Sequence, residues 1–396
     1  MLRARSAVSE MKVGPKTFQA LHAEVLAPAS AAGVTALNSP RAQEPTALVA
    51  PPVSSLFSEV KKESSAKKPG TLKPHEALMN TINKPRYSSF ASAFSSVVGK
   101  SSIEELRAAA AAAGNKPIVL IAGDQCTGKG TAAEGLVAEL GGQNTGTGTV
   151  LRALAKENGL SIEQMSAMLS GKSVDVDDGK GGTKKVALSD YPHLGSAEDV
   201  DVRLDFRAAK AIATSAFTKA DGSTIDISVF ESRLAGHLGQ FLSGLDRKNV
   251  VSVYLYAAPR VQAERYLDRE VWKPAEAKAT TPAEKQIIAT ARTLAEHILG
   301  GLDDTVPLGA ALLKLIAGLK GSGVAGLDVL AGKVSGIAGR DDNDKTRLLA
   351  LYGVNYQDRS AFDVVVDTNG KTPAQVKQAI LAAVAKKTAA PTTQGS

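Results

Sequence analysis

A short stretch of the sequence, IVLIAGDQCTGKGTAAEGL (residues 118–136), has the residue types and spacing of a phosphate-binding loop. An apolar run ends at Gly123, and Gly128 and Lys129 follow a few positions later. The glycines permit a tight turn whose backbone N–H groups converge on phosphate oxygens, and the lysine adds a compact positive charge. The helix predicted after the loop adds the partial positive charge of its N-terminus. We therefore expect this stretch to bind the phosphates of an ATP-like triphosphate.

The expected loop lies between a predicted strand and a predicted helix, which is the context of a P-loop. In that motif a Ser or Thr beside the lysine holds Mg²⁺, but here Gly130 takes that place and the hydroxyl comes one position later, at Thr131. The sequence leaves two alternatives for Mg²⁺, a contact from Thr131 or a contact through water. The residues expected to bind ATP are Gly123, Asp124, Gln125, Cys126, Thr127, Gly128, Lys129, Gly130 and Thr131.

Arginines and carboxylates recur downstream of the loop, where a second phosphate would need them. Transfer of a phosphoryl group between two anions requires cations on the acceptor and on the migrating group. Arg340, Asp344 and Arg347 are spaced to share one face of a helix. A single arginine is usually a solvated surface charge, but a recurring set favours a ligand site. The other members are Arg152 early in a predicted helix, Glu231 and Arg233 at the carboxyl end of a predicted strand, and Arg265 and Arg269 four positions apart.

Five motifs in register carry a family resemblance: GKGT, TGTVLRALAKENGLSIEQM, FESRLAG, RDxxDxxR (residues 340–347) and YGVNYQDRSAFDVVVDT. From about residue 116 to 387 the chain resembles cytidylate kinases, especially the compact archaeal-type branch of these P-loop nucleoside monophosphate kinases. The resemblance implies a P-loop NTPase-type fold with a helical lid, and transfer of the γ-phosphoryl group of MgATP to CMP or dCMP. Two alternatives remain: a related kinase for another monophosphate or small metabolite, and an inactive nucleotide-binding interaction protein.

The same resemblance implies roles for individual residues. Lys129 and the loop amides would hold the ATP phosphates, while Arg265, Arg269 and Arg340 would close over the transferring group. The acceptor phosphate would contact Arg152, Arg233 and the hydroxyl of Thr147 or Thr149, the sugar or base would contact Asp344 and Arg347, and Glu231 would lie near the metal or acceptor.

Strands and helices alternate after residue 116, which predicts an α/β fold with a parallel sheet covered by helices on both faces. Short apolar runs predict strands at residues 117–123, 224–233, 250–259 and 362–368. Helical periodicity and capping residues predict helices at 101–114, 131–140, 150–157, 200–214, 260–270 and 372–387. Two segments interrupt this alternation and are interpreted as insertions: a polar, Gly-rich hairpin or mobile loop at 171–196, where acceptor-binding helices are expected, and a helical Ala/Leu/Gly-rich segment at 272–338.

Residues 1–100 are predicted to be a disordered extension that precedes a kinase domain at 101–396. The first 113 residues lack aspartate and hold 9 of the 17 prolines, and their basic, Ser-rich start leaves an organelle-targeting segment as the alternative. They carry 14 of the 47 basic and 8 of the 40 acidic side chains, so the remainder is nearly neutral and a nucleic-acid partner is not expected.

Composition also limits the cellular setting. Cys126 is the single cysteine, which excludes an internal disulfide and a cysteine-rich metal site. No apolar run reaches the roughly 18 residues that span a bilayer, so no membrane association is expected. We expect a cytoplasmic monomer or small homo-oligomer whose ligands are small-molecule nucleotides.

Overall fold

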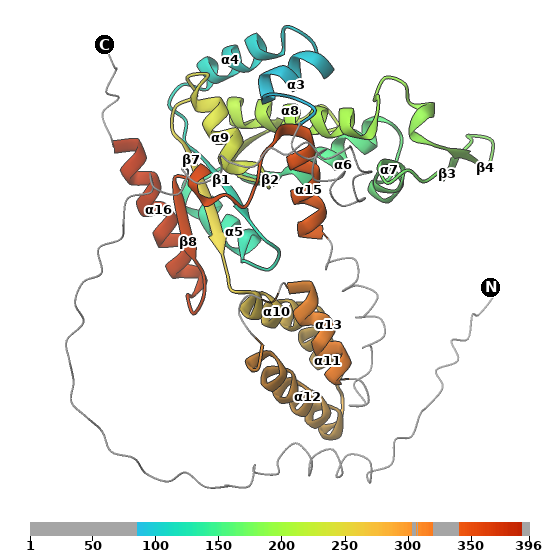
Figure 1. Ribbon diagram of the computed structural model, residues 1–396, viewed down its shortest axis with the longest axis vertical. Coiled ribbons are helices and arrows are strands. Elements are labelled where there is room, and N and C mark those ends of the chain that lie inside the picture. Colours follow the sequence, from blue (N-terminus) through green and yellow to red (C-terminus); the bar gives the residue numbers. More distant parts are fainter. Residues whose placement is uncertain (1–84, 303–305, 307, 320–339, 390–396) are drawn as a thin grey trace, which may run out of the picture. The chain divides into compact units, whose positions relative to one another are not determined.

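The computed structural model describes residues 85–302, 306, 308–319 and 340–389. The fold is of the α/β class. Its central sheet has five parallel strands in the order β2-β6-β1-β7-β8 (Figure 1). A short sixth strand, β5, pairs antiparallel with β6. The bounds are β1 Ile118–Gly123, β2 Gln143–Gly146, β5 Ala216–Thr218, β6 Thr224–Glu231, β7 Val250–Tyr256 and β8 Val364–Asp367.

The four strands predicted from apolar runs are confirmed, and their side chains alternate between two cores. In β1, Ile118 and Leu120 belong to one cluster of buried residues, whereas Val119 and Ile121 belong to another. Successive side chains of a strand point to opposite faces, so both faces of this sheet must be covered. β2 was not predicted, because its residues are polar and the strand lies at an edge.

Helices cover both faces of the sheet, which confirms the predicted α/β arrangement. On one face α5 packs with α16 over the core that contains Val119 and Ile121, and on the other α8 and α9 pack over the core that contains Leu120. Figure 1 shows α5 and α16 beside one another and α9 with α8 across the sheet from them. The bounds are α4 Ser102–Ala113, α5 Lys129–Leu140, α6 Thr147–Glu157, α7 Ile162–Leu169, α8 Ala197–Thr214, α9 Ala235–Ser243, α10 Pro259–Leu267, α15 Arg340–Tyr352 and α16 Pro373–Ala389.

The folded region begins earlier than the predicted boundary at residue 101. Helix α3 (Phe90–Val97) buries Phe90 and Phe94, which lie within ring-contact distance of Phe206, Phe241 and Tyr352. Aromatic rings of this size contribute several kcal/mol when buried, which explains why the segment is ordered against the core. The part of the expected extension at residues 1–84 lies outside the described residues.

Both expected insertions leave the parallel sheet intact. Residues 171–196 contain an antiparallel hairpin of β3 (Val174–Asp177) and β4 (Thr183–Val186), one of the two forms expected there. The second insertion is helical, with α11 Lys273–Lys278, α12 Pro282–Gly300 and α13 Leu308–Leu319. These helices pack with α10 around a separate apolar core that includes Trp272 and Leu312. Residues 320–339 of the insertion lie outside the described part of the chain.

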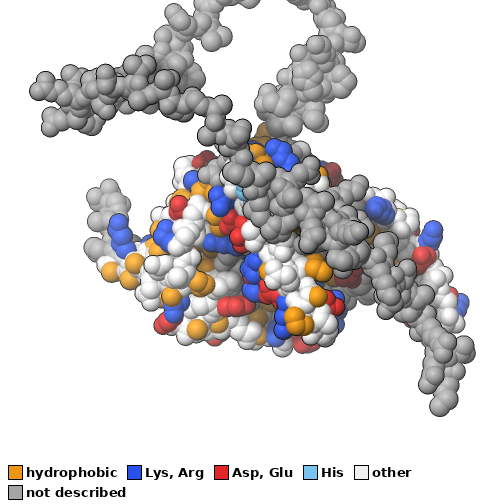
Figure 2. All heavy atoms as spheres, turned by 90° about the horizontal axis from the view of Figure 1, so that it is seen from below, with side chains coloured by type: hydrophobic (Ala, Val, Ile, Leu, Met, Phe, Trp, Pro, Cys, Tyr) orange, Lys and Arg blue, Asp and Glu red, His pale blue; other side chains and the backbone are white. Residues whose placement is uncertain are grey.

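The surface of the described residues mixes charges of both signs. Figure 2 shows basic and acidic side chains interspersed over the visible face. Among the described residues, the large apolar side chains that are exposed are Ile287, Leu313 and Val365. No helix in the described ranges is long and apolar enough to cross a membrane.

Candidate functional site

The loop between β1 and α5 is a tight turn that two glycines make possible. Gly123 has φ +145°, and a Cβ there would collide with the carbonyl oxygen of Leu255 on the neighbouring strand. Gly128 has φ +93° and immediately precedes α5. The Thr127 hydroxyl donates to the carbonyl oxygen of Asp124 across 2.9 Å, which closes the turn. The loop therefore has the compact backbone that was expected for it.

Lys129 is the first residue of α5, and its side chain folds back over the loop. Its Nζ donates to the carbonyl oxygens of Gly123 at 2.9 Å and Asp124 at 2.7 Å. Burial, together with the nearby charge of Arg233, lowers the pKa of Lys129 to about 8. The amine is therefore still largely protonated at neutral pH, and it is held by neutral carbonyls that an anion can replace.

The side chain of Asp124 connects the loop to neighbouring segments by hydrogen bonds. Its carboxylate accepts hydrogen bonds from Tyr356 Oη at 3.1 Å, Gln357 Nε2 at 3.0 Å and Tyr254 Oη at 3.3 Å. These contacts tie the loop to β7 and to the segment before β8. Asp124 and Gly123 are thus absent from the cavity lining, whereas the expected loop residues from Gln125 to Thr131 line it.

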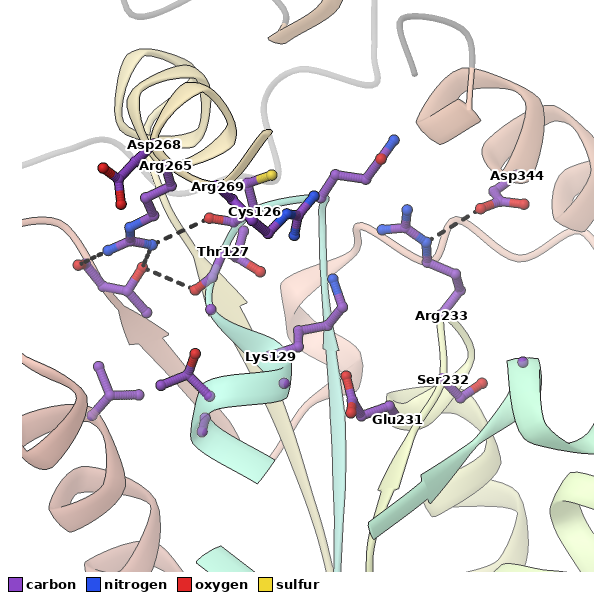
Figure 3. A pocket seen from close by; sticks show the side chains of 18 of the residues that line it. Cys126, Thr127, Lys129, Glu231, Ser232, Arg233, Arg265, Asp268, Arg269 and Asp344 are labelled. Carbon is purple, nitrogen blue, oxygen red and sulfur yellow. Dashed lines mark hydrogen bonds and ion pairs between the residues drawn. The ribbon is translucent and has the colours of Figure 1, made fainter. Parts of the chain in front are cut away.

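A cavity of about 1390 Å³ brings most of the expected site residues together. Figure 3 shows Lys129 between Arg265 on one side and Arg233 on the other. The helical insertion also contributes to the wall through Trp272 and Arg292. The expected residues that line the cavity are Gln125, Cys126, Thr127, Gly128, Lys129, Gly130, Thr131, Thr147, Glu231, Arg233, Arg265, Arg269, Asp344 and Arg347.

Arg233, which follows β6, is enclosed by oxygen atoms and an aromatic ring. Its guanidinium donates to the Gly123 carbonyl at 2.6 Å and to Asp344 at 3.2 Å, and it also contacts Asp341. Its centre lies 5.1 Å from the ring centroid of Tyr356. The Asp341 carboxylate also accepts the backbone N–H of Gln125 at 3.4 Å. Carboxylates of α15 therefore occupy donor groups that would suit a phosphate.

Asp341 belongs to the RDxxDxxR motif, but the sequence did not predict its contact with the loop. Further along α15, Arg347 pairs with Asp201 of α8 at 2.9 Å and with Asp344 at 3.7 Å. Asp201 was missed as well. The signal for it was its spacing from Asp205, because residues four apart share a helix face.

The two arginines of the α10 region lie on the other side of the loop. Arg265 donates to the carbonyl oxygen and hydroxyl of Thr368 at 2.8 and 2.9 Å, and to the carbonyl oxygen of Cys126 at 3.3 Å. Arg269, in the π-helix after α10, is 63% exposed and pairs with Glu270 at 2.8 Å. α15 begins at Arg340, whose side chain lies outside what the structure describes. The closing role expected for these arginines stays a prediction.

Arg152 and Thr149 lie in an adjoining cavity of about 300 Å³ rather than in the main one. Arg152 donates to the Thr149 hydroxyl at 3.0 Å. Glu231, which accepts from Asn144 Nδ2 at 2.7 Å, lines both cavities. The Thr147 hydroxyl is buried, has no partner among the described residues, and lies at the wall of the main cavity.

Hard oxygen ligands for a metal are present at the loop, but a preformed cage is not found. Within the described ranges, no group of three or more His, Cys, Asp or Glu residues could hold a metal ion. Thr131 and Glu231 line the main cavity and present a hydroxyl and a carboxylate. Mg²⁺ is commonly held by one or two protein oxygens together with water and phosphate, and these residues fit that mode.

Cys126 adopts φ +59° in the loop and packs against the apolar core of the insertion. Burial raises the pKa of its thiol above the ordinary value, although Arg269 and Lys129 act in the opposite direction. A protonated thiol is a weak nucleophile, so this geometry favours a packing role.

Comparison of the chain with models of known protein families and with curated proteins finds no match.

Proposed function

We propose that the chain is a P-loop phosphotransferase that moves the γ-phosphoryl group of ATP to a nucleoside monophosphate, with CMP or dCMP as the leading acceptor. One observation carries the proposal. The loop, Lys129 at the start of α5, Arg233 just after β6 and Arg265 of α10 line a single cavity. The phosphates of a donor and of an acceptor need several cations around one cavity, whereas a single neutral ligand does not.

The donor triphosphate fits the loop side of the cavity. The backbone N–H groups before α5 and the N-terminus of that helix attract phosphate oxygens. Lys129 can exchange its two carbonyl partners for the outer phosphates. Mg²⁺ would be held by Thr131, directly or through water, and by Glu231, and it would supply neutralising charge on the phosphates.

The acceptor fits the side formed by β6 and α15. Arg233 would bind the acceptor phosphate after exchanging its carboxylate partners, and Arg347 and Asp344 would face the sugar or base. Thr147 offers a hydroxyl without a partner among the described residues. In this proposal no side chain acts as a nucleophile, since the acceptor phosphate attacks directly. The protein contributes position, exclusion of water and positive charge.

The test is an assay of ADP release by the full chain with ATP and Mg²⁺, across AMP, CMP, dCMP, UMP and GMP. We expect turnover with CMP or dCMP, and loss of most of it in Lys129→Ala. Turnover with a different acceptor would favour a related kinase for another substrate. ATP binding without turnover of any acceptor would favour an inactive nucleotide-binding protein.

A further inference from the structure

A buried carboxylate lies in the wall of the main cavity, away from the loop. Asp205 of α8 is 5% exposed and lines the cavity. Tyr352 Oη of α15 donates to its Oδ2 at 2.7 Å. In the described part of the chain no other group donates to this carboxylate, and no Lys or Arg lies within ion-pair distance of it. A buried carboxyl group with one neutral partner is costly unless a ligand or a proton satisfies it.

Its neighbour Asp201, one helical turn earlier, has different electrostatic surroundings. Asp201 has an ion pair with Arg347 at 2.9 Å. Asp201 thus has a cationic partner, whereas the partner of Asp205 is a neutral hydroxyl. The same cavity also has aliphatic lining side chains, among them Leu151, Leu169, Leu204 and Leu348. Apolar walls with a few polar groups are the usual lining for a flat organic ring.

Helix α15 sets the distance between this carboxylate and the loop. Asp341 at its start contacts the loop, Asp344 contacts Arg233, and Tyr352 at its end contacts Asp205. At 1.5 Å per residue, the axis from Asp341 to Tyr352 covers about 16 Å. Phosphate-binding groups thus lie at one end of the helix, and the buried carboxylate lies at the other.

We propose that Asp205 is a specificity-determining residue that selects an acceptor base bearing an amino group, as cytosine does, over one bearing an oxygen at the same position, as uracil does. This inference rests on the proposed function, because it takes the cavity wall near Asp205 as the place of the acceptor base. Asp205 receives no proton and transfers none. It acts only through a hydrogen bond to the bound base.

The discrimination follows from donor and acceptor chemistry. An ionised carboxylate only accepts hydrogen bonds. The 4-amino group of cytosine donates, whereas the oxygen at the same position of uracil or thymine accepts. The first ring would satisfy the buried carboxylate, and the second would place two acceptors against each other. Mispaired polar groups of this kind change discrimination by roughly 10- to 100-fold.

The experiment compares CMP with UMP in the full chain at pH 8 and repeats the comparison in Asp205→Asn. An amide can turn its NH₂ toward the uracil oxygen, so the ratio of kcat/KM for CMP to that for UMP should fall roughly 10- to 100-fold. This ratio does not depend on the fraction of folded enzyme, so partial unfolding cannot imitate the result. Glu198→Gln is the matched control, since Glu198 starts the same helix but lies on the surface, paired with Arg86. It should leave the ratio unchanged.

An unchanged ratio in Asp205→Asn, or equal use of CMP and UMP by the wild-type chain, overturns the inference while leaving phosphoryl transfer intact. If the wild-type chain transfers no phosphoryl group, the proposed function fails, and calorimetric binding of CMP and UMP then decides the inference alone. Tighter binding of CMP than of UMP, with a preference that decreases in Asp205→Asn, supports the inference. Equal Kd values for CMP and UMP reject it.

Discussion

Arg233 donates to the carboxylate of Asp344 across 3.2 Å, which joins the carboxyl end of β6 to helix α15. The same guanidinium contacts Asp341, and that carboxylate accepts the Gln125 N–H of the loop. These carboxylates fill positions beside the loop and Arg233 that the proposed phosphates would take. In the proposed function, phosphate binding would displace them, so this pairing would compete with the substrates.

The first prediction concerns this competition. Asp341→Asn removes a negative charge that contacts a largely buried cation, so the free energy of unfolding should fall by roughly 1–3 kcal/mol. Saturating CMP should stabilise the variant more than the wild type, because the ligand no longer displaces a carboxylate. Urea denaturation with and without CMP measures both quantities. Equal stabilisation of the two proteins by CMP would show that Asp341 does not compete.

The second prediction follows from the lowered pKa of Lys129, which is about 8. Bound phosphates favour the charged amine, so nucleotide binding raises this pKa. Below pH 8 the amine is already protonated and binding takes up little proton. Above pH 8 binding must recruit a proton, and affinity should fall by up to about tenfold per pH unit.

Calorimetry of ATP binding at pH 9, in two buffers of different ionisation enthalpy, measures this uptake. We expect up to about one proton per ATP in the wild type. Lys129→Met should bind ATP roughly 10- to 100-fold more weakly, because the charge-assisted contacts are lost, and should take up fewer protons per ATP. Proton uptake that persists in Lys129→Met would assign the effect to another group.

How far the fold follows from the sequence depends on the range of the interactions. β1, β6, β7 and β8 were predicted because each is a local apolar run. β2 was missed since its four residues, three of them polar, are a strand only through pairing with β6, about 85 residues away. The start of the folded region was predicted too late, at residue 101, although Phe90 and Phe94 have helical spacing, because their ring partners lie in distant helices.

The candidate site divides in the same way. The loop and Lys129 form a local motif whose geometry its own residues dictate. Asp205 and Tyr352 are 147 positions apart, so their hydrogen bond depends on how α8 meets α15. Arg152 was expected with the other arginines but lies in the adjoining cavity. Residue type was enough to suggest each cation, but only tertiary packing decides which of them share a cavity.

The third prediction compares two glycines of the loop. A Cβ at Gly130 would meet nothing within 4 Å, so Gly130→Ala should fold, and it should gain roughly 0.5–1 kcal/mol from better helix propensity. The open space there faces the proposed phosphates, so ATP affinity should fall. Gly123→Ala should destabilise the fold, because its Cβ would collide with Leu255. Thermal unfolding and ATP titration of both variants test this, and unchanged ATP affinity in Gly130→Ala would place the phosphates elsewhere.

The fourth prediction tests the early start of the folded region. Phe94 is fully buried and contacts the rings of Phe90, Phe206 and Phe241. Phe94→Ala in the full chain should lower the free energy of unfolding by roughly 3–5 kcal/mol. Leu313→Ala, at a side chain that is 48% exposed, should change it far less. A small effect of Phe94→Ala in urea denaturation would mean that α3 adds little to the fold.

The last prediction uses Asp205 as a probe of stability against pH. Burial raises its pKa from 3.8 to about 7, opposed by Arg347 and the Tyr352 hydroxyl and aided by Asp201. The folded state thus favours the protonated carboxyl, and the resulting stability is present below pH 4 and is lost as the pH rises through about 7. Asp205→Asn cannot ionise and escapes this loss. Its stability relative to the wild type should therefore increase between pH 4 and pH 7, by at most about 4 kcal/mol.

Urea denaturation of both proteins at pH 4.5, 6 and 8 measures this difference, and Glu198→Gln serves as the control because Glu198 is exposed. A difference between wild type and Asp205→Asn that does not change with pH would mean that Asp205 is ionised throughout. A cationic partner, in addition to the neutral Tyr352 hydroxyl, would then have to face the Asp205 carboxylate. That outcome would also weaken its assignment to the acceptor base, because a carboxylate already satisfied by the protein has little to gain from an amino group.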